Sequence, residues 1–407
     1  MGADRAAVRP FLVDLAAFLL GGSAEGVFQA RQHVVEAGRR YGVRADVLIL
    51  PDQMVLTIDD GNGQTVDLIE TAPGLSLDRM EQGKRLAADI EAGLPLAAAV
   101  ERLAAIVAAP PPYPPWLRVA GVVLFSVGFA PSVVGSIAEV AVTLVLALVM
   151  GVLFVAFSGR RWEPLLPLIG SFAVACLALT VFADVAERVG PVLLMVPALF
   201  VVIPGDYLSA AAGELAVGRI SAGASRLVWA LFLLVELIVG IALAAQVTGA
   251  QDWTLNDGTA PGTLPFWVIV LAWIPFTLGL AWAFNAGMRN VPVMAALVMT
   301  TYLLYAGTAK LAGDVIGTLV AGTVAGLAAT ILARRPQLPP RLELILGPFF
   351  TLTVGSLGLR GVTQLISGHP IGGAKTLTDF LLIVPTVAFA LLIGYLLASS
   401  PRLRRNM

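Results

Sequence analysis

Residues 227–248 read LVWALFLLVELIVGIALAAQVT, and Glu236 is the only charged side chain in this stretch. An α-helix rises about 1.5 Å per residue, so roughly 20 apolar residues cross the hydrocarbon core of a bilayer. The stretch therefore predicts a transmembrane helix. Apolar runs of similar length recur from Leu117 onward, separated by Gly, Pro or charged residues. This pattern is typical of a polytopic α-helical membrane protein.

The composition indicates two parts with different surroundings. Of 407 residues, 58% are apolar and 13% are charged, whereas roughly a quarter of the residues in soluble domains are charged. Residues 1–116 hold 10 basic and 15 acidic side chains, and the rest of the chain holds 16 and 12. We therefore expect an acidic, water-facing amino-terminal domain and a mildly basic membrane part. Neither part has the basic stripe that nucleic-acid binding requires.

The amino-terminal domain is predicted to be a small cytoplasmic α+β unit over residues 1–109. We expect a helical segment with a break at Gly21-Gly22, three strands separated by turn signals, and two further helices, the first with Ser76 as its N-cap. These elements cover residues 11–41, 46–50, 54–59, 64–70, 76–91 and 95–108. The proline-rich residues 110–116 then predict a stiff linker that enters the membrane.

Ten transmembrane spans are predicted in the membrane part, at roughly 20 residues per crossing. They lie at residues 117–132, 134–157, 165–183, 190–207, 226–248, 264–284, 291–309, 312–333, 342–358 and 377–398. The first and fourth are short, so nine or eleven spans are the alternatives. The first five spans make up one half, over residues 117–249, and the last five make up a second half, over 264–398. Residues 250–263 are expected to form an external loop, and residues 399–407 a cytoplasmic tail.

The basic residues of the short loops predict the orientation, because Lys and Arg gather on the cytoplasmic side. With the amino terminus inside, the outer loops hold only Arg188, Lys310, Arg360 and Lys375. The inner loops and the tail hold Arg160, Arg161, Arg219, Arg226, Arg289, Arg334, Arg335, Arg341, Arg402, Arg404 and Arg405. We therefore expect a protein of the inner (plasma) membrane with both termini in the cytoplasm.

The two halves resemble each other in sequence. At a constant offset of 150 residues, four small residues recur: Gly205, Gly218, Gly223 and Ala224 match Gly355, Gly368, Gly373 and Ala374. Ile169-Gly170-Ser171 likewise matches Ile316-Gly317-Thr318. Because each half has an odd number of spans, the second copy lies upside down, as in many secondary transporters. The predicted fold is therefore two inverted five-helix repeats preceded by a soluble α+β domain.

Helix breaks are the first clue to a site, because such transporters bind substrate where broken helices expose backbone groups near the middle of the membrane. Pro197 and Pro204-Gly205 predict breaks in the fourth span, and Asp206 adjoins the second of them. Pro348, Gly355 and Gly358 predict breaks in matching places in the ninth span. The alternative is that Pro and Gly are simply frequent in membrane helices.

Acidic residues inside the spans are the second clue, because an ionisable group in hydrocarbon normally faces a partner or an aqueous cavity. Glu236 lies near the middle of the fifth span, with no other charge nearby in sequence. A carboxyl group withdrawn from water binds a proton more readily, so Glu236 is a candidate proton carrier. The alternative is a structural carboxyl group that bonds to another helix. Glu139 in the second span is another candidate, although it lies nearer a helix end.

Other chemistry is sparse. Cys176 is the only cysteine, and His33 and His369 are the only histidines, so neither a disulfide framework nor a metal site is expected. The stretch Gly21-Gly22-Ser23 lacks the strand and the lysine of a phosphate loop. We therefore expect no cofactor, and either coupling to an ion gradient or a passive path.

The order of these features resembles the threonine/serine exporter family, whose members join a cytoplasmic domain to ten membrane spans. The segments that carry the resemblance are Gly22-Ser23-Ala24-Glu25, Tyr41-Gly42-Val43, Ile203-Pro204-Gly205, Glu214, Gly218, Gly223, Arg226 and residues 355–361. The chain departs from the family pattern at Phe28, Ala210 and Val354. These departures bear on the substrate more than on the fold.

The resemblance implies efflux of threonine or serine driven by the proton motive force. Backbone dipoles at the two helix breaks would face a zwitterion, Glu236 or Glu214 would carry the coupled proton, and Arg360 would meet a carboxylate. The candidate residues for substrate and coupling are Glu139, Pro204, Gly205, Asp206, Glu214, Arg226, Glu236, Gly355, Gly358 and Arg360.

Three alternatives stay open. Related two-component proteins are associated with dicarboxylate export, which would make a molecule like succinate the substrate. A passive channel would share the spans and need no carboxyl group inside the membrane. The soluble domain could be an enzyme anchored by the spans, but it shows no nucleophile or metal set. Gating of the inner mouth, or pairing of protomers into a homo-oligomer, suits residues 1–109 better.

Overall fold

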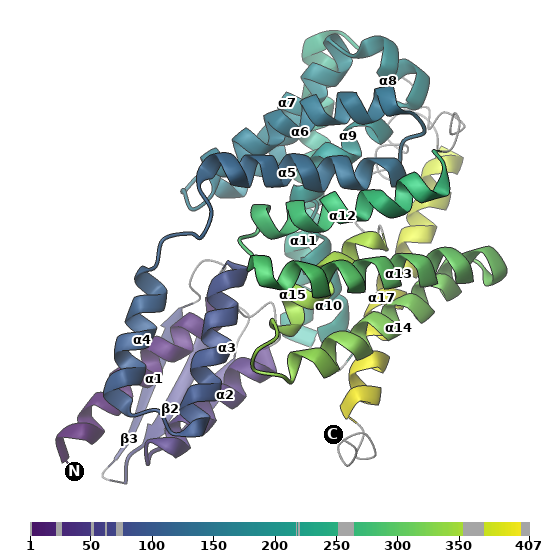
Figure 1. The fold of residues 1–407 in the computed structure, drawn as a ribbon. Helices are drawn as coiled ribbons and strands as arrows, with labels where there is room; N and C mark the ends of the chain where they lie inside the picture. Colours follow the sequence, from purple (N-terminus) through teal and green to yellow (C-terminus); the bar gives the residue numbers. More distant parts are fainter. Residues whose placement is uncertain are drawn as a thin grey trace.

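The computed structural model describes residues 2–21, 27–49, 53–61, 63–70, 76–216, 218, 220–250, 264–352 and 370–399. Figure 1 shows a large helical bundle with a smaller domain, which contains the sheet, at one end of it. The short linker between the last helix of this domain and the first helix of the bundle is visible at the left of the picture.

The soluble domain combines four helices with a three-stranded sheet, as expected. Its elements are α1 (Gly2–Gly21), α2 (Val27–Arg40), β1 (Arg44–Ile49), β2 (Gln53–Asp59), β3 (Gln64–Glu70), α3 (Leu77–Ala92) and α4 (Leu96–Ala108). The strands are antiparallel in the order β1-β2-β3. Successive strand residues face opposite sides, so Met54, Leu56 and Ile58 of β2 are all buried in the domain core.

The first helix differs from the prediction, which placed its start at Phe11. α1 begins at Gly2 and contains Pro10 in its interior. Proline there removes one backbone hydrogen bond and normally disfavours a helix. Val8 and Phe11, on either side of Pro10, are each only 2% exposed in the domain core. The free energy gained by burying these two side chains offsets the lost hydrogen bond, so the helix continues past Pro10.

The membrane part consists of long helices joined by short connections. Its elements are α5 (Pro115–Phe129), α6 (Ile137–Phe157), α7 (Leu166–Thr180), α8 (Ala183–Val189), α9 (Pro191–Leu199), α10 (Gly205–Ala216), α11 (Ile220–Thr248), α12 (Phe266–Ala283), α13 (Val291–Ala312), α14 (Asp314–Ala333), α15 (Arg341–Thr351) and α17 (Pro370–Ser399). Short 3-10 turns lie at η2 (Ala130–Ser132), η3 (Glu163–Leu165), η4 (Phe200–Val202) and η5 (Met288–Asn290). The chain is a multi-pass membrane protein.

Within the described residues, eight helices are long and apolar enough to cross a membrane, and one bent pair would make nine. The bent pair is α8 with the segment Pro191–Val202, at an angle of 103°. The sequence predicted ten spans. The difference lies at the fourth and ninth predicted spans, which are not straight helices of spanning length in the described part of the chain.

The fourth predicted span, 190–207, is interrupted rather than continuous. α9 ends at Leu199, η4 follows, and α10 begins only at Gly205. Pro204 pushes the residue before it into an extended conformation, and Ile203 has φ −68° and ψ 123°. The ninth predicted span, 342–358, begins as α15, and its part beyond Leu352 lies outside the described residues.

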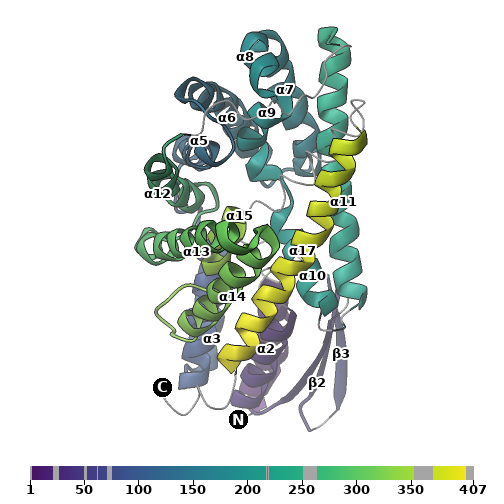
Figure 2. The same ribbon diagram turned by 90° about the vertical axis from the view of Figure 1, so that its right-hand side faces the viewer.

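The two halves pack their helices in the same pattern. In the first half α5 packs on α6, α6 on α7 and α9, and α7 on α9 and α11. In the second half α12 packs on α13, α13 on α14 and α15, and α14 on α15 and α17. Helix α10 packs on both long helices, α11 and α17, which are labelled in Figure 2. These contacts of the two halves therefore correspond, whereas α8 and α10 have no counterpart among the described residues of the second half.

The halves meet where α5 crosses α12, and the contacts there are reciprocal. A Cβ atom on Gly128 would lie 2.7 Å from the carbonyl oxygen of Ala272, and one on Gly279 would lie 2.6 Å from that of Gly121. Such distances leave no room for a side chain, so the glycines permit the close approach. A Cβ on Gly121 would lie 2.6 Å from the nitrogen of Ala283. As the residue numbers increase along α5, those of the contacting residues in α12 decrease, so the two helices are antiparallel.

The soluble domain is joined to the membrane part through α3. Leu86 and Ile90 of this helix lie in the core of the domain, whereas Leu77 and Met80 lie in the core of the helical bundle. The amides of Leu77 and Asp78 donate to the carbonyls of Phe284 and Asn285 at the end of α12, at 3.3 and 3.0 Å.

These carbonyls satisfy the free amides at the start of α3. Ser76, the predicted N-cap, makes no side-chain capping bond. The connection after α12, like the one after α14, was predicted to face the cytoplasm. The domain therefore docks on the side of the bundle that the charge count assigns to the inside.

Candidate functional site

The helix break of the first half lies against the ninth predicted span. All nine residues of α9 are buried, and α15 is buried from Glu343 to Thr351. A Cβ atom on Gly205 would lie 2.6 Å from Cε1 of Phe349 in α15. The rings of Phe200 and Phe350 are 5.1 Å apart. The interrupted segment of the first half and α15 of the second half therefore meet in the interior of the bundle.

The backbone at the first break is strongly bent. The amide of Gly205 donates to the carbonyl of Ile203 at 2.7 Å, across Pro204. Pro204 has no amide hydrogen to donate, and the carbonyl of Pro204 accepts from Leu208 at 3.1 Å as the first bond of α10. Asp206 is the second residue of α10. The start of α10, with the positive end of its helix dipole, thus faces the break.

Aromatic side chains of the α5–α12 crossing pack against Phe200 of η4 and Phe350 of α15. Phe129 stacks on Phe200 with ring centroids 3.8 Å apart, and Phe125 stacks on Phe276 at 4.6 Å. Phe125 also meets the edge of Phe350 at 5.2 Å. Each of these rings is at most 4% exposed. They form a buried apolar contact between the two halves, called the aromatic cluster below.

Sequence reasoning missed the aromatic cluster, although a signal was present. Phe200 and Phe350 are separated by the same offset of 150 residues as the matched glycines. An aromatic pair that obeys the repeat would have pointed to the contact between the halves. The lesson is that large residues in register with the repeat are as informative as small ones.

Glu214 and Arg226, both predicted site residues, are brought together. Nε of Arg226 lies 3.3 Å from Oε2 of Glu214, and the two side chains are 19% and 11% exposed. Helices α10 and α11 approach closely here, because a Cβ on Gly223 would lie 2.9 Å from the carbonyl oxygen of Ala211. The ion pair gives Glu214 a compensating charge, which makes it a poorer proton carrier than an isolated carboxyl group.

Glu236 lies in the middle of α11 and is 8% exposed. Its Oε2 has no hydrogen-bond partner in the part of the chain that the structure describes. Gly240, four residues further along the same face, lies against Leu168 and Ser171 of α7. Glu236 therefore faces the packed side of α11. Arg226 lies roughly 15 Å from Glu236 along the helix axis, so Glu236 is not part of the ion pair between Arg226 and Glu214.

Glu139 has a local structural role that differs from the one predicted. The amide of Glu139 donates to Oγ of Ser136, and Oε2 of Glu139 accepts from the amides of Gly135 and Ser136 at 2.8 and 3.2 Å. This is a capping box at the start of α6. The motif Ser136-x-x-Glu139 was visible in the sequence as its signal. The carboxylate caps the helix terminus, and its role in coupling stays a prediction.

The remaining predicted site residues, Gly355, Gly358 and Arg360, lie outside the described residues. Within the described residues there is no group of three or more His, Cys, Asp or Glu side chains that could hold a metal ion. Cys176 is a free cysteine in α7. The described site therefore consists of the backbone break at Pro204-Gly205, the ion pair, the buried carboxyl group of Glu236 and the aromatic cluster.

Comparison with protein families gives one match: a family model described as "Putative threonine/serine exporter" (ThrE) covers residues 11–248. The match spans the soluble domain and the whole first half of the membrane part, including the break at Pro204-Gly205 and the ion pair. Comparisons with curated proteins and with solved structures found no match.

Proposed function

Because the chain belongs to the threonine/serine exporter family, we propose that it exports threonine or serine across the inner membrane, driven by the proton motive force. The proposal rests on the contact between Gly205 of the first half and Phe349 of the second half. The helices of these two halves pack in the same pattern. A secondary transporter needs a central site at such a junction, where each half can move relative to the other.

We propose that the halves are inverted repeats. Support comes from the antiparallel crossing of α5 and α12 and from its reciprocal glycine contacts. Two copies of one unit related by a twofold axis in the membrane plane make such paired contacts. If one position of the first copy contacts a second position of the other copy, the symmetry repeats that contact with the two copies exchanged. Ten spans follow if the segments containing α9 and α15 each complete one crossing.

The substrate would bind at the two breaks. A zwitterionic amino acid presents a carboxylate and an ammonium group, and the start of α10 after Pro204-Gly205 offers amides and a positive dipole to the carboxylate. Gly355, Gly358 and Arg360 are proposed to line the same site from the second half. The aromatic cluster would close the contact between the halves beside the first break, because its rings have no polar groups.

Glu236 is our proposed proton carrier. It combines deep burial in a transmembrane helix with an Oε2 atom that has no hydrogen-bond partner among the described residues. An ionised carboxylate in such a place is costly, so its proton occupancy can depend on which side of the membrane it can reach. Glu214 is the second choice, because Arg226 already compensates its charge.

The proposed topology places the soluble domain and both termini in the cytoplasm. The domain docks on the connections after α12 and α14, and the distribution of basic residues assigns both connections to the inner side. Labelling of single cysteines in intact and opened cells would check this orientation.

Transport by the full chain in proteoliposomes tests the function. Labelled threonine, serine and succinate would be followed in parallel, with and without an imposed pH gradient. The proposal predicts gradient-dependent accumulation of threonine or serine. Accumulation of succinate alone would indicate the dicarboxylate alternative, and movement that ignores the gradient would indicate a passive channel.

A further inference from the structure

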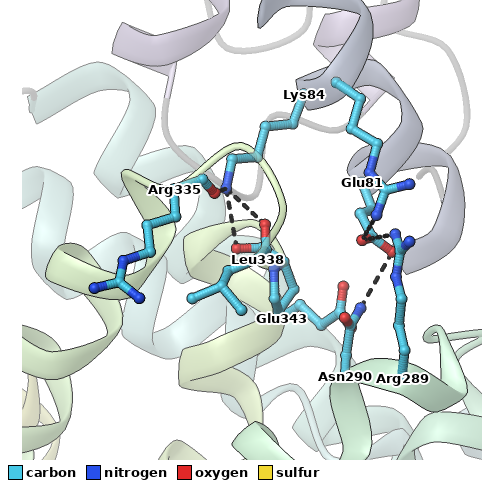
Figure 3. Close-up of polar contacts among 9 residues, drawn as sticks. Glu81, Lys84, Arg289, Asn290, Arg335, Leu338 and Glu343 are labelled. Carbon is cyan, nitrogen blue, oxygen red and sulfur yellow. Dashed lines mark hydrogen bonds and ion pairs between the residues drawn. The ribbon is translucent and has the colours of Figure 1, made fainter.

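A chain of buried polar side chains connects the soluble domain to α15. Glu81 of α3 is 5% exposed, and Glu343 of α15 is fully buried. Asn290 lies between them at the start of α13. Its Nδ2 donates to Oε2 of Glu81 at 3.1 Å and to Oε1 of Glu343 at 2.7 Å. A single amide group thus uses both of its hydrogens to bridge two carboxyl groups from different parts of the molecule (Figure 3).

The charge of Glu81 is compensated from both sides of the interface. Arg85, one turn along α3, donates to Oε1 of Glu81 at 2.8 Å. Arg289, on the membrane side, forms an ion pair with the same oxygen. A buried carboxylate needs such partners, and here one of them comes from each part. Separation of the two parts would leave Glu81 with half of its compensation.

Lys84 makes a second connection on the same side of α3. Its Nζ donates to the carbonyl oxygens of Arg335, Leu338 and Pro339, at 3.0, 2.8 and 3.3 Å. These carbonyls belong to the connection between α14 and α15, and Figure 3 shows Lys84 reaching into it. An ammonium group is well suited to the partial negative charge of carbonyls that follow a helix end. Lys84 therefore fixes the connection that leads into α15.

The interface has an apolar part and a polar part that follow one another along α3. Leu77 and Met80 are buried in the core of the bundle, whereas Glu81 and Lys84 form hydrogen bonds with it. Water can replace the partners of polar groups when a contact opens, so the net value of each hydrogen bond is small, whereas apolar side chains gain nothing from water. The polar contacts are thus the part of the interface that can be exchanged for water, and the apolar end is the part that stays attached.

We propose that Glu81, Lys84 and Asn290 form an inner latch that positions α15 through Glu343 and the α14–α15 connection. The inference rests on the proposed function, because it concerns the movement that transport requires. Phe349 of α15 touches Gly205 at the first break, so a shift of α15 changes the central site directly. In this account the soluble domain is a gate element, with the apolar end of α3 as the pivot and the latch as the releasable contact.

A thiol reporter in α15 tests the latch. Thr351 lies at the end of α15 and is 2% exposed, so Thr351→Cys in a Cys176→Ala background places a single cysteine beside the proposed site. The latch variants are Asn290→Ala and Lys84→Met, which act on separate contacts, so that failure of one variant to fold leaves the other. The readout is the rate of maleimide labelling of the purified full chain.

We expect each latch variant to raise the labelling rate about fivefold, which is the scale of losing one net hydrogen bond. Lys84→Arg should restore the slow rate, because it keeps a cation that donates to the carbonyls. The matched control is Asp89→Asn, a carboxyl-to-amide change on α3 at an exposed ion pair with Arg102, and it should leave the rate unchanged. Equal rates in the latch variants and the control would overturn the proposal.

The labelling assay also separates the latch from the proposed function. Faster labelling in the latch variants of a protein that moves neither threonine nor serine would retain the latch and reject the substrate. If the gradient drives threonine transport but the Asn290 and Lys84 variants leave the labelling rate unchanged, the transporter is retained and the latch is rejected.

Discussion

The two membrane halves share a packing pattern but differ in their polar groups. The first half carries a buried carboxyl group, Glu236, in its long helix α11. The residue 150 positions later in α17 is Thr386, whose hydroxyl donates to the carbonyl of Leu382 within the same helix. The second half instead carries Asn290, which bonds to Glu343 of α15 and to Glu81 of the soluble domain. Under the two proposals above, the first half carries the coupling group and the second half carries the contact that controls it.

Loss of the carboxyl group in the first half should have the largest effect. Glu236→Gln keeps the size of the side chain but cannot release a proton, so gradient-driven threonine accumulation in proteoliposomes should fall at least about tenfold. Thr386→Val, at the corresponding place in the second half, should retain accumulation. Equal loss in both variants would show that the halves do not divide the work in this way.

Contact between the halves can be broken at the α5–α12 crossing. Gly279→Ala places a methyl group against the backbone of α5, so we expect a loss of about 3 kcal/mol, at the upper end of overpacking effects. Thermal unfolding in detergent would measure it. Gly307→Ala in α13 is the control, because a Cβ there would meet no atom within 4 Å. Similar melting temperatures for both variants would contradict the close crossing.

The ion pair between α10 and α11 should matter less. Arg226→Met removes the cation that compensates Glu214, and we expect a loss of about 2 kcal/mol in the same thermal unfolding experiment. The double variant Arg226→Met, Glu214→Gln should recover part of the loss, because no carboxylate then needs compensation. A double variant no more stable than the single one would indicate that the pair is not coupled.

The soluble domain should show the smallest effect, a dependence on pH. Burial lowers the pKa of His33 below its ordinary value of 6.5, although nearby Glu91 partly opposes this. The unfolded chain then binds a proton more readily than the folded one, so stability is highest above pH 6.5 and decreases as the pH falls through that value. His33→Gln should weaken the decrease in melting temperature between pH 7.5 and 5.5. An unchanged decrease would assign it to other groups.

Much of this fold follows from sequence patterns of short range. Apolar runs predicted the straight spans, turn residues predicted the three-stranded sheet, and Pro204 predicted the interruption before α10. These features depend on the residues themselves and on local backbone rules. The interruption was expected as a break inside one span, whereas the chain ends one helix and starts another there.

The features that sequence reasoning missed depend on residues far apart in the chain. Glu81 and Asn290 look like ordinary surface residues until α3 docks on the connection after α12. The pairing of Glu214 with Arg226 needed the turn between α10 and α11, although both residues were among the candidates. The continuation of α1 through Pro10 depends on the core that Val8 and Phe11 enter. Tertiary contacts decide each of these, and a single sequence does not show them.

Substrate protection of the Thr351→Cys reporter tests the central claim most directly, because the claim is that the interrupted segments of both halves form the site. In the Cys176→Ala background, saturating threonine or serine should slow maleimide labelling of this cysteine at least about threefold, and succinate should not. Gradient-driven uptake of threonine without any protection at position 351 would contradict the claim and place the site elsewhere in the bundle.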